Sequence, residues 1–237
     1  MYVINSEKLN WSKIMKKIIL YTIITSTLFG LTCLASEKSS HENLYLRLDA
    51  GKSKAQKFKN SDAYINDKLK TSNIISLGIG KYLDSNFRTD LTVTLRDYKL
   101  SNNTESRSAN QKIKSTAVML NGYYDIDYFN MITPYLSAGL GMSHNNSGKL
   151  TLIYETVNAS TIYNKKTINN LAWQVGAGTA IKINDSFNLD LSYKFINLGK
   201  VKTTSGVATS GADTATTPAA SAKLKAQEIT AGLRFNF

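Results

Sequence analysis

The sequence predicts an all-β fold, a closed antiparallel transmembrane β-barrel of eight strands. After residue 43, apolar side chains alternate with small or polar ones in eight successive segments. Alternation is the side-chain period of a β-strand, and a tilted strand needs ~9–11 residues to cross a membrane. Short and long connections alternate between the segments, and the chain ends on an aromatic segment of the same pattern.

Each segment has one apolar face and one polar face. In the first segment, Leu46 and Leu48 oppose Arg47 and Asp49. The predicted strands cover residues 44–52, 74–83, 87–100, 112–125, 134–143, 171–183, 187–198 and 225–237.

The apolar faces are the ones expected to meet lipid. Their centres carry no charge, whereas the opposite faces carry many charged side chains. These charged residues are Arg47, Asp49, Arg88, Asp90, Arg96, Asp190, Lys194, Glu228 and Arg234. A membrane-spanning chain must pair every backbone polar group, which leaves helices and closed barrels, and eight strands enclose a lumen that side chains fill. We therefore expect a charged interior without a wide pore. The alternative is a soluble lipocalin-like cup, in which the charged face points to water and the apolar face lines a ligand cavity.

The connections predict the orientation of the barrel. Residues 84–86, 126–133 and 184–186 form short connections, and residues 53–73, 101–111, 144–170 and 199–224 form long ones. Short periplasmic turns and long outer loops are typical of bacterial barrels. The stretch 199–224 is rich in Ser, Thr and Gly and lacks periodicity, so we expect a mobile tip there.

The N-terminal region reads as an export signal. Lys16 and Lys17 precede an apolar run, which ends in Cys33-Leu34-Ala35. We interpret residues 1–35 as an N-terminal extension with a signal peptide, and residues 36–237 as the barrel domain. A membrane anchor or a lipoprotein cysteine at Cys33 are the alternatives. Cleavage would remove the only cysteine and lower the net charge from +12 to about +9, a balance that favours anionic partners.

The last residues carry the most specific motif. Thr230, Gly232, Phe235 and Phe237 fit a polar-x-Gly-x-x-aromatic-x-aromatic pattern that ends on Phe. This pattern resembles the terminal signal that bacterial barrels present to the barrel assembly machinery.

The sequence gives no support for catalysis. Barrel enzymes that act on lipid A need a histidine with Ser or acidic partners, and only His41 and His144 occur. His144 continues the lipid-facing row of its segment, so we expect no catalytic residue. We likewise expect no cofactor, no metal site and no nucleic-acid partner.

On these segments and the terminal motif, residues 36–237 resemble the small outer-membrane barrels of the OmpA-transmembrane-domain and opacity type, and in particular the barrel adhesins of rickettsiae. The resemblance implies a location in the bacterial outer membrane and loops that contact host-cell or serum proteins. A small porin or a structural scaffold is one alternative function, and a barrel enzyme that modifies lipid A is another. Outer-membrane lipid and lipopolysaccharide are further expected partners, because the first and third long loops are basic. The candidate loop-binding residues are Lys54, Lys57, Lys59, Tyr64, Lys68, Lys70, Lys149, Tyr154, Tyr163, Lys165 and Lys166.

Overall fold

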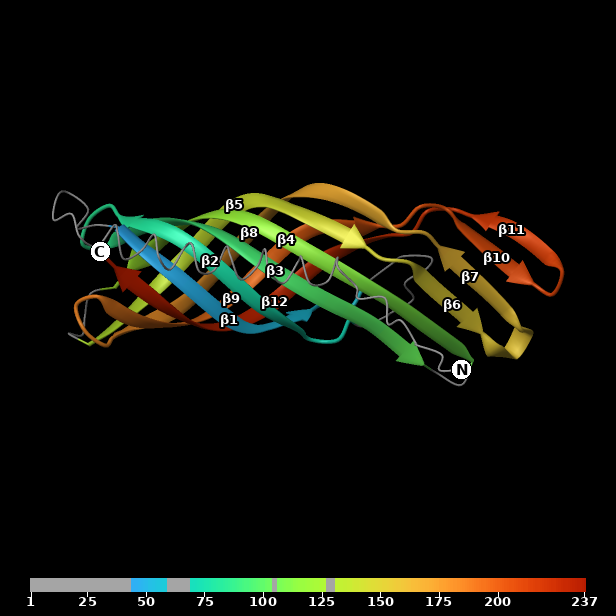
Figure 1. Ribbon diagram of the computed structural model, residues 1–237, viewed down its shortest axis with the longest axis horizontal. Helices are drawn as coiled ribbons and strands as arrows, with labels where there is room; N and C mark the ends of the chain where they lie inside the picture. The colour runs from blue at the N-terminus through green and yellow to red at the C-terminus, as the bar shows by residue number, and fades with distance from the viewer. Residues whose placement is uncertain (1–43, 59–68, 104–105, 127–130) are drawn as a thin grey trace, which may run out of the picture. The chain divides into compact units, whose positions relative to one another are not determined.

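The computed structural model describes residues 44–58, 69–103, 106–126 and 131–237. Eight strands of this part of the chain close into an antiparallel ring in the order β1-β2-β3-β4-β5-β8-β9-β12, which the pairing of β12 with β1 completes (Figure 1). They are β1 (Leu44–Ala55), β2 (Ser72–Tyr82), β3 (Phe87–Asn103), β4 (Arg107–Asp125), β5 (Ile132–Ser147), β8 (Lys166–Lys182), β9 (Phe187–Lys202) and β12 (Ser221–Asn236). The predicted fold class and the eight membrane-crossing segments are confirmed.

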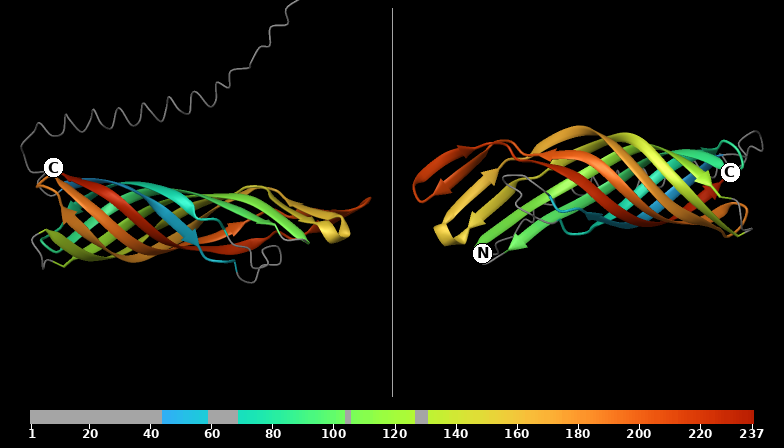
Figure 2. Two further views of the ribbon diagram at one scale, coloured as in Figure 1. Left: turned by 90° about the horizontal axis from the view of Figure 1, so that it is seen from below. Right: turned by 180° about the vertical axis from the view of Figure 1, so that it is seen from behind.

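Two of the short connections, at residues 84–86 and 184–186, are tight turns at one end of the ring. Asp84 Oδ1 accepts backbone N–H bonds from Asn86 at 2.8 Å and Phe87 at 2.7 Å. Asn184 Oδ1 does the same for Ser186 at 3.0 Å and Phe187 at 2.8 Å. Asp and Asn favour such turns because their side chains bond to the backbone two residues on. We call the opposite end, where the long connections lie, the outer end (Figure 2).

The long connections contain four strands that the sequence pattern did not predict. The third carries β6 (Leu150–Tyr154), a single 3-10 turn η1 (Glu155–Val157) and β7 (Ala159–Tyr163). The fourth carries β10 (Gly206–Ser210) and β11 (Asp213–Thr217). Together they form an extension sheet in the order β4-β6-β7-β10-β11, which continues the barrel wall at its outer end (Figure 1).

The prediction of a mobile tip over 199–224 is therefore wrong. β10 pairs with β11 across a two-residue turn, and it also pairs with β7 from the other loop. Gly211, with φ at +57°, takes the left-handed position that such hairpin turns require. The partner that stabilises β10 lies more than forty positions away in the chain, so local composition did not reveal it.

The interior near the short turns is a charged network. The Arg47 guanidinium bonds to Asp49 at 2.8 Å, to Asp90 at 3.1 Å and to the Tyr123 hydroxyl at 2.9 Å. Arg88 pairs with Asp125 at 2.8 Å and stacks over the Tyr123 ring, 4.0 Å from its centroid. These contacts confirm that the charged faces of these strands point into the barrel. They also show that Asp125, which the sequence pattern did not identify, belongs to the buried network.

A second charged cluster lies farther out along the same interior. Arg96 donates two bonds to Glu228, from Nε to Oε1 at 2.6 Å and from Nη2 to Oε2 at 3.0 Å. The Ser53 hydroxyl donates a third bond to Oε1 at 2.8 Å. Both charged side chains are 1 % exposed. Such a pair adds little net stability, but the loss of one partner is costly because it leaves the other charge buried alone.

The interior at the outer end contains a large apolar cluster, which the sequence pattern did not predict. Tyr98, Leu100, Ile113, Ile196 and Leu198 are at most 1 % exposed and pack in one cluster. Its other members are Ala55, Phe58, Leu69, Ala109, Ala117, Met119, Leu150, Leu152, Tyr163, Ala172, Val201, Ala220, Ala222, Leu224 and Ala226. The barrel is thus apolar outside along its middle but apolar inside at its outer end. This inversion is what a change of surroundings from lipid to water requires.

Candidate functional site: the outer end of the barrel

A row of polar residues marks where the lipid-facing surface ends. On each strand of the ring, the side chains that face away from the lumen are mostly apolar along the middle of the barrel. The next such side chain, two positions nearer the outer end, is polar. These polar residues are Lys52, Asn73, Asp97, Thr116, His144, Asn169, Asn197 and Gln227. Several are cross-strand neighbours: Lys52 Nζ donates to Asn73 Oδ1 at 2.5 Å, and His144 Nδ1 lies 2.7 Å from Asn169 Oδ1.

The apolar band below this row has the height of an outer membrane. On β8 the lipid-facing residues run from Leu171 to Ile181. Ten residue steps correspond to roughly 33 Å along the strand, and to about 25 Å along the axis at a tilt near 40°. The polar row therefore lies at the outer edge of the hydrocarbon region.

A partial collar of lysines lies just beyond this row, on β1, β3, β4, β9 and β12 and on the adjoining connections. The lysines are exposed or half-exposed on the outward faces of the strands and at the bases of the loops. The collar consists of Lys54, Lys57, Lys70, Lys99, Lys112, Lys114, Lys149, Lys200, Lys202, Lys223 and Lys225. Lys112 pairs with Asp97 at 3.0 Å. The collar attracts anions, because the positive potentials of neighbouring lysines add together near the surface.

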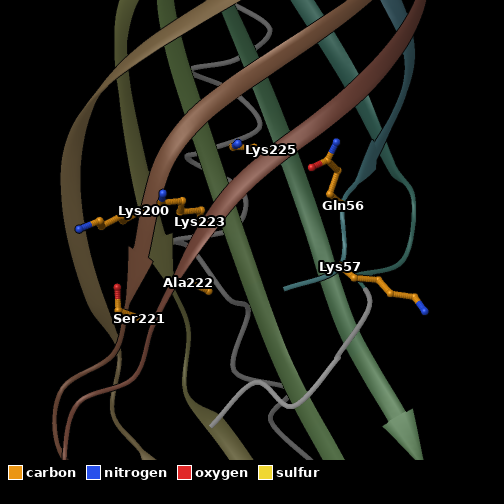
Figure 3. Close-up of a pocket in the computed structure, with 7 residues that line it drawn as sticks. All are labelled: Gln56, Lys57, Lys200, Ser221, Ala222, Lys223 and Lys225. Atoms are coloured by element: carbon orange, nitrogen blue, oxygen red, sulfur yellow. The ribbon is translucent and has the colours of Figure 1, made fainter. Parts of the chain in front are cut away.

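Two hollows in the collar gather the lysines. The β9–β12 lysine groove, about 440 Å³, is lined by Lys57, Lys200, Lys223 and Lys225 together with Gln56, Ser221 and Ala222 (Figure 3). The β3–β4 lysine groove, about 550 Å³, is lined by Lys70, Lys99, Lys112 and Lys149 together with Leu100, Ser101, Asn110, Gln111 and Thr151. No acidic residue lines either groove.

A β-bulge places Lys200 in the first of these grooves. Asn197 pairs with Lys225 and Lys200 pairs with Lys223, so β9 has one more residue than β12 between the two pairs. Gly199, with φ at +76°, takes the conformation that such a bulge needs. The bulge turns Lys200 outward and the next residue, Val201, into the apolar cluster.

The structure sorts the loop-binding residues that the sequence suggested. Lys54, Lys57, Lys70 and Lys149 belong to the collar, while Lys165 and Lys166 are exposed at the start of β8. Lys59, Tyr64 and Lys68 lie outside the described residues. Tyr154 is half-buried against the apolar cluster.

Tyr163 is a correction to that set. It was expected to supply contact area, but its ring is 7 % exposed and belongs to the apolar cluster. The sequence prediction did not include four collar lysines, Lys99, Lys200, Lys223 and Lys225. Lys99 and Lys225 fell in predicted strands, and Lys200 and Lys223 fell in the stretch 199–224 that was expected to be a mobile tip. The outward row of β12 carried the signal, since it changes from Ile229 to Gln227, Lys225 and Lys223.

The terminal motif occupies both faces of β12. Thr230 points inward and bonds to Ser192 at 2.6 Å, and a Cβ at Gly232 would collide with the Asp49 carboxylate. Phe235 faces outward and packs on Phe187 with ring centroids 5.0 Å apart. These positions give Thr230, Gly232 and Phe235 a structural role, and the role of the motif in assembly stays a prediction.

The described part of the chain contains His144, one of the two histidines of the sequence. His144 faces outward as expected, and its ring bonds to an amide rather than to a carboxylate or hydroxyl. His41 lies outside the described part of the chain. Within residues 44–58, 69–103, 106–126 and 131–237, no three His, Cys, Asp or Glu side chains are grouped so as to hold a metal ion. No helix in these ranges is both long and apolar enough to cross a membrane.

Comparisons with known proteins agree with this architecture. Residues 23–237 match the family described as outer membrane protein beta-barrel domain. A Rickettsia bellii protein named as an adhesin is 30 % identical over 197 residues, which cover 79 % of this chain and 86 % of that protein. A Rickettsia prowazekii protein named in the same way is 29 % identical over 235 residues, covering 93 % and 99 %. Neisserial surface protein A superposes with a TM-score of 0.52 at 16 % identity over 82 % of this chain and 97 % of that one, a likeness of fold.

The family match spans the whole described barrel, and the apolar band and the alternating short and long connections fit it. The chain belongs to the outer-membrane protein β-barrel domain family, and it is a bacterial outer-membrane protein whose outer end is exposed at the cell surface.

Proposed function

We propose that this barrel is a surface adhesin, which contacts host-cell or serum proteins through its extension sheet. The relatives named as adhesins support this function. The sheet β6-β7-β10-β11 stands beyond the lysine collar, and it is held to the barrel wall by pairing with β4. Binding residues are often carried by segments that a rigid scaffold positions.

The observation that carries the proposal is an apolar patch on the water-facing side of this sheet. Val207 on β10 pairs directly with Ile162 on β7, and Ile153 on β6 lies on the same face. Ile153 is 43 % exposed and Val207 51 % exposed, whereas Ile162 is half-exposed. We call these three residues the outer apolar patch. Apolar patches with polar surroundings mark protein interaction sites.

Two further partners belong to this proposal. The exposed lysines of the loops contact phosphates of lipopolysaccharide, because phosphate groups offer the opposite charge. The C-terminal motif engages the barrel assembly machinery during insertion.

The test expresses the protein on a non-adherent bacterium and measures binding to cultured host cells and to immobilised serum glycoproteins. The parent should confer binding, and the triple variant I153T/I162T/V207T should reduce it about tenfold, the equivalent of 1.4 kcal/mol. Threonine keeps the strand propensity, so heat-modifiable gel mobility should stay unchanged.

The matched control is D213N/A215T on the opposite face of the neighbouring β11, where both residues are exposed. It should bind as the parent does. No binding by the parent would contradict the adhesin function, and full binding by I153T/I162T/V207T would contradict the assignment to the outer apolar patch.

A second design removes the tip hairpin without opening the barrel. The Thr203 N–H donates to the Ala220 carbonyl at 2.9 Å, and the Ala220 N–H donates to the Thr203 hydroxyl at 3.0 Å. These bonds close the base of the hairpin, so residues 204–219 can be replaced by an Asn-Gly turn. The shortened barrel should assemble normally and lose most of the binding that the outer apolar patch provides, because Val207 is removed with the hairpin.

A further inference from the structure

We propose that the lipid-facing surface of β8, β9, β12 and β1, together with the lysines directly outward of it, holds one phosphorylated, multiply acylated lipid of the outer leaflet. This site is separate from the outer apolar patch, and it lies on the membrane-embedded wall rather than on the loops.

The wall is hollowed at this position because its side chains are small. Ala50, Ala177, Thr179 and Ala231 line a groove of about 780 Å³, which we call the small-residue groove. Its remaining lining residues are Gly51, Lys52, Gly178, Leu191, Ser192, Tyr193, Ile229 and Thr230. By contrast, the outward rows of β2 and β3 carry Ile, Leu and Val at successive positions.

The groove is wide enough for several acyl chains. It spans four neighbouring strands, and three spacings of about 4.8 Å correspond to roughly 14 Å. It lies within the apolar band, where hydrocarbon chains surround the barrel. A lipid is therefore the occupant that this location provides.

The tilt of the strands decides which lysines stand outward of the groove. A lipid lies along the membrane normal, whereas the strands tilt by about 40°. Moving 15 Å outward along the axis therefore means crossing about two strands and advancing three to four residues. Figure 1 shows that this path leads from β12 and β1 towards β2 and β3.

The strand registers then identify the residues. Ala50 pairs with Ile75, and Ile75 pairs with Leu95. Lys99 lies four residues outward of Leu95 on β3. Ile229 pairs with Lys52 and Lys52 pairs with Asn73, three residues from Lys70. Lys70 and Lys99 both line the β3–β4 lysine groove, so that groove stands above the small-residue groove.

The charges select a lipid with more than one negative group. Lys52 bounds the small-residue groove itself, and Lys54 is the next outward residue on β1. Lys70, Lys99 and Lys149 stand above them, and the nearby Asp97 is paired with Lys112 at 3.0 Å. Lysine binds phosphate as a mobile point charge. Two or more phosphates on one headgroup match this arrangement better than the single charge of a simple phospholipid.

The test uses the full barrel, refolded in detergent micelles, and native mass spectrometry to count bound lipids. The probes are a bis-phosphorylated lipid A, its mono-phosphorylated form with the same acyl chains, and phosphatidylglycerol. The parent should retain one molecule of the bis-phosphorylated lipid. It should bind each of the other two probes about tenfold more weakly.

Two sets of matched variants locate the site. K52Q/K70Q/K99Q should weaken binding about tenfold, while K165Q/K166Q/K200Q, which removes the same charge at the outer ends of β8 and β9, should leave it within about twofold. A177F/A231F should fill the small-residue groove and abolish retention, while A138F on lipid-facing β5 should not. Heat-modifiable mobility verifies that each variant is folded.

Three results would each overturn the proposal. Equal losses in the two lysine variants would show a diffuse collar without a site. Equal retention of phosphatidylglycerol would show that the phosphates are not recognised. Unchanged retention by folded A177F/A231F would show that the acyl chains lie elsewhere.

Discussion

The buried pair of Arg96 and Glu228 offers a sharp test of how the barrel interior is stabilised. Glu228 accepts three bonds, two from Arg96 at 2.6 and 3.0 Å and one from Ser53 at 2.8 Å. Glu228→Gln keeps the shape of the side chain but removes its charge. The Arg96 guanidinium is then left without its counter-charge at a site where it is 1 % exposed. We expect a loss of about 3–5 kcal/mol, the cost measured for breaking buried ion pairs elsewhere.

Removing both charges should restore most of this loss. The double variant R96L/E228L replaces the pair by apolar side chains, and we expect its stability to lie within about 1–2 kcal/mol of the parent. Asp97→Asn is the matched control on the surface. Asp97 and Lys112 are 44 % and 51 % exposed, so breaking their pair should cost below about 1 kcal/mol.

The assay is urea unfolding in lipid vesicles, followed by heat-modifiable gel mobility and by the fluorescence of lipid-facing Trp173. A free-energy loss below about 1 kcal/mol for Glu228→Gln would refute the reasoning, because it would mean that water reaches Arg96. The same follows if R96L/E228L is as unstable as the single variant.

Three further predictions concern conduction, assembly and turns. Planar-bilayer recordings should show no large, stable conductance, because the Arg47 network and the apolar cluster fill the lumen; such a conductance would favour a small porin instead. Deleting Phe237 should leave export intact but lower outer-membrane insertion, measured by surface labelling, and normal surface levels would contradict the signal. Asp84→Ala should lower the free energy of unfolding by about 1–2 kcal/mol, because two hydrogen bonds to backbone N–H groups are lost. The control Ser85→Ala should change the free energy of unfolding by less than about 0.5 kcal/mol. Equal effects of the two substitutions would contradict the turn geometry.

The sequence predicted the membrane-crossing part of the fold because lipid imposes one rule on every strand. The rule fails where the strands leave the membrane. On β3, Leu95 faces outward and Arg96 inward, but three residues later Lys99 faces outward while Tyr98 and Leu100 are buried. Alternation continues across this point, and only its polarity is reversed. A pattern of period two does not reveal the level at which the surroundings change.

The candidate site was harder to predict for a related reason. Its lysines lie on strand ends and at a bulge, and their grouping depends on registers between strands that are distant in the chain. The extension sheet depends on pairing between two loops, of which each alone looks unstructured. Lys54, Lys57, Lys70 and Lys149 were identified because basic residues are conspicuous in any loop. Tyr163 was misplaced because a tyrosine in a loop gives no sign of whether it is buried.

The tip hairpin has a consequence for how such a protein changes under immune pressure. Every residue of β11 is exposed or half-exposed, and the turn at Gly211 and Ala212 is exposed as well. Substitutions away from buried contacts usually change stability by less than about 0.5 kcal/mol. Antibodies against living cells can reach this tip beyond the membrane, so a part of the described barrel that is visible to them is also free to vary. Antigenic drift can therefore proceed at residues 212–217 while the barrel keeps its fold.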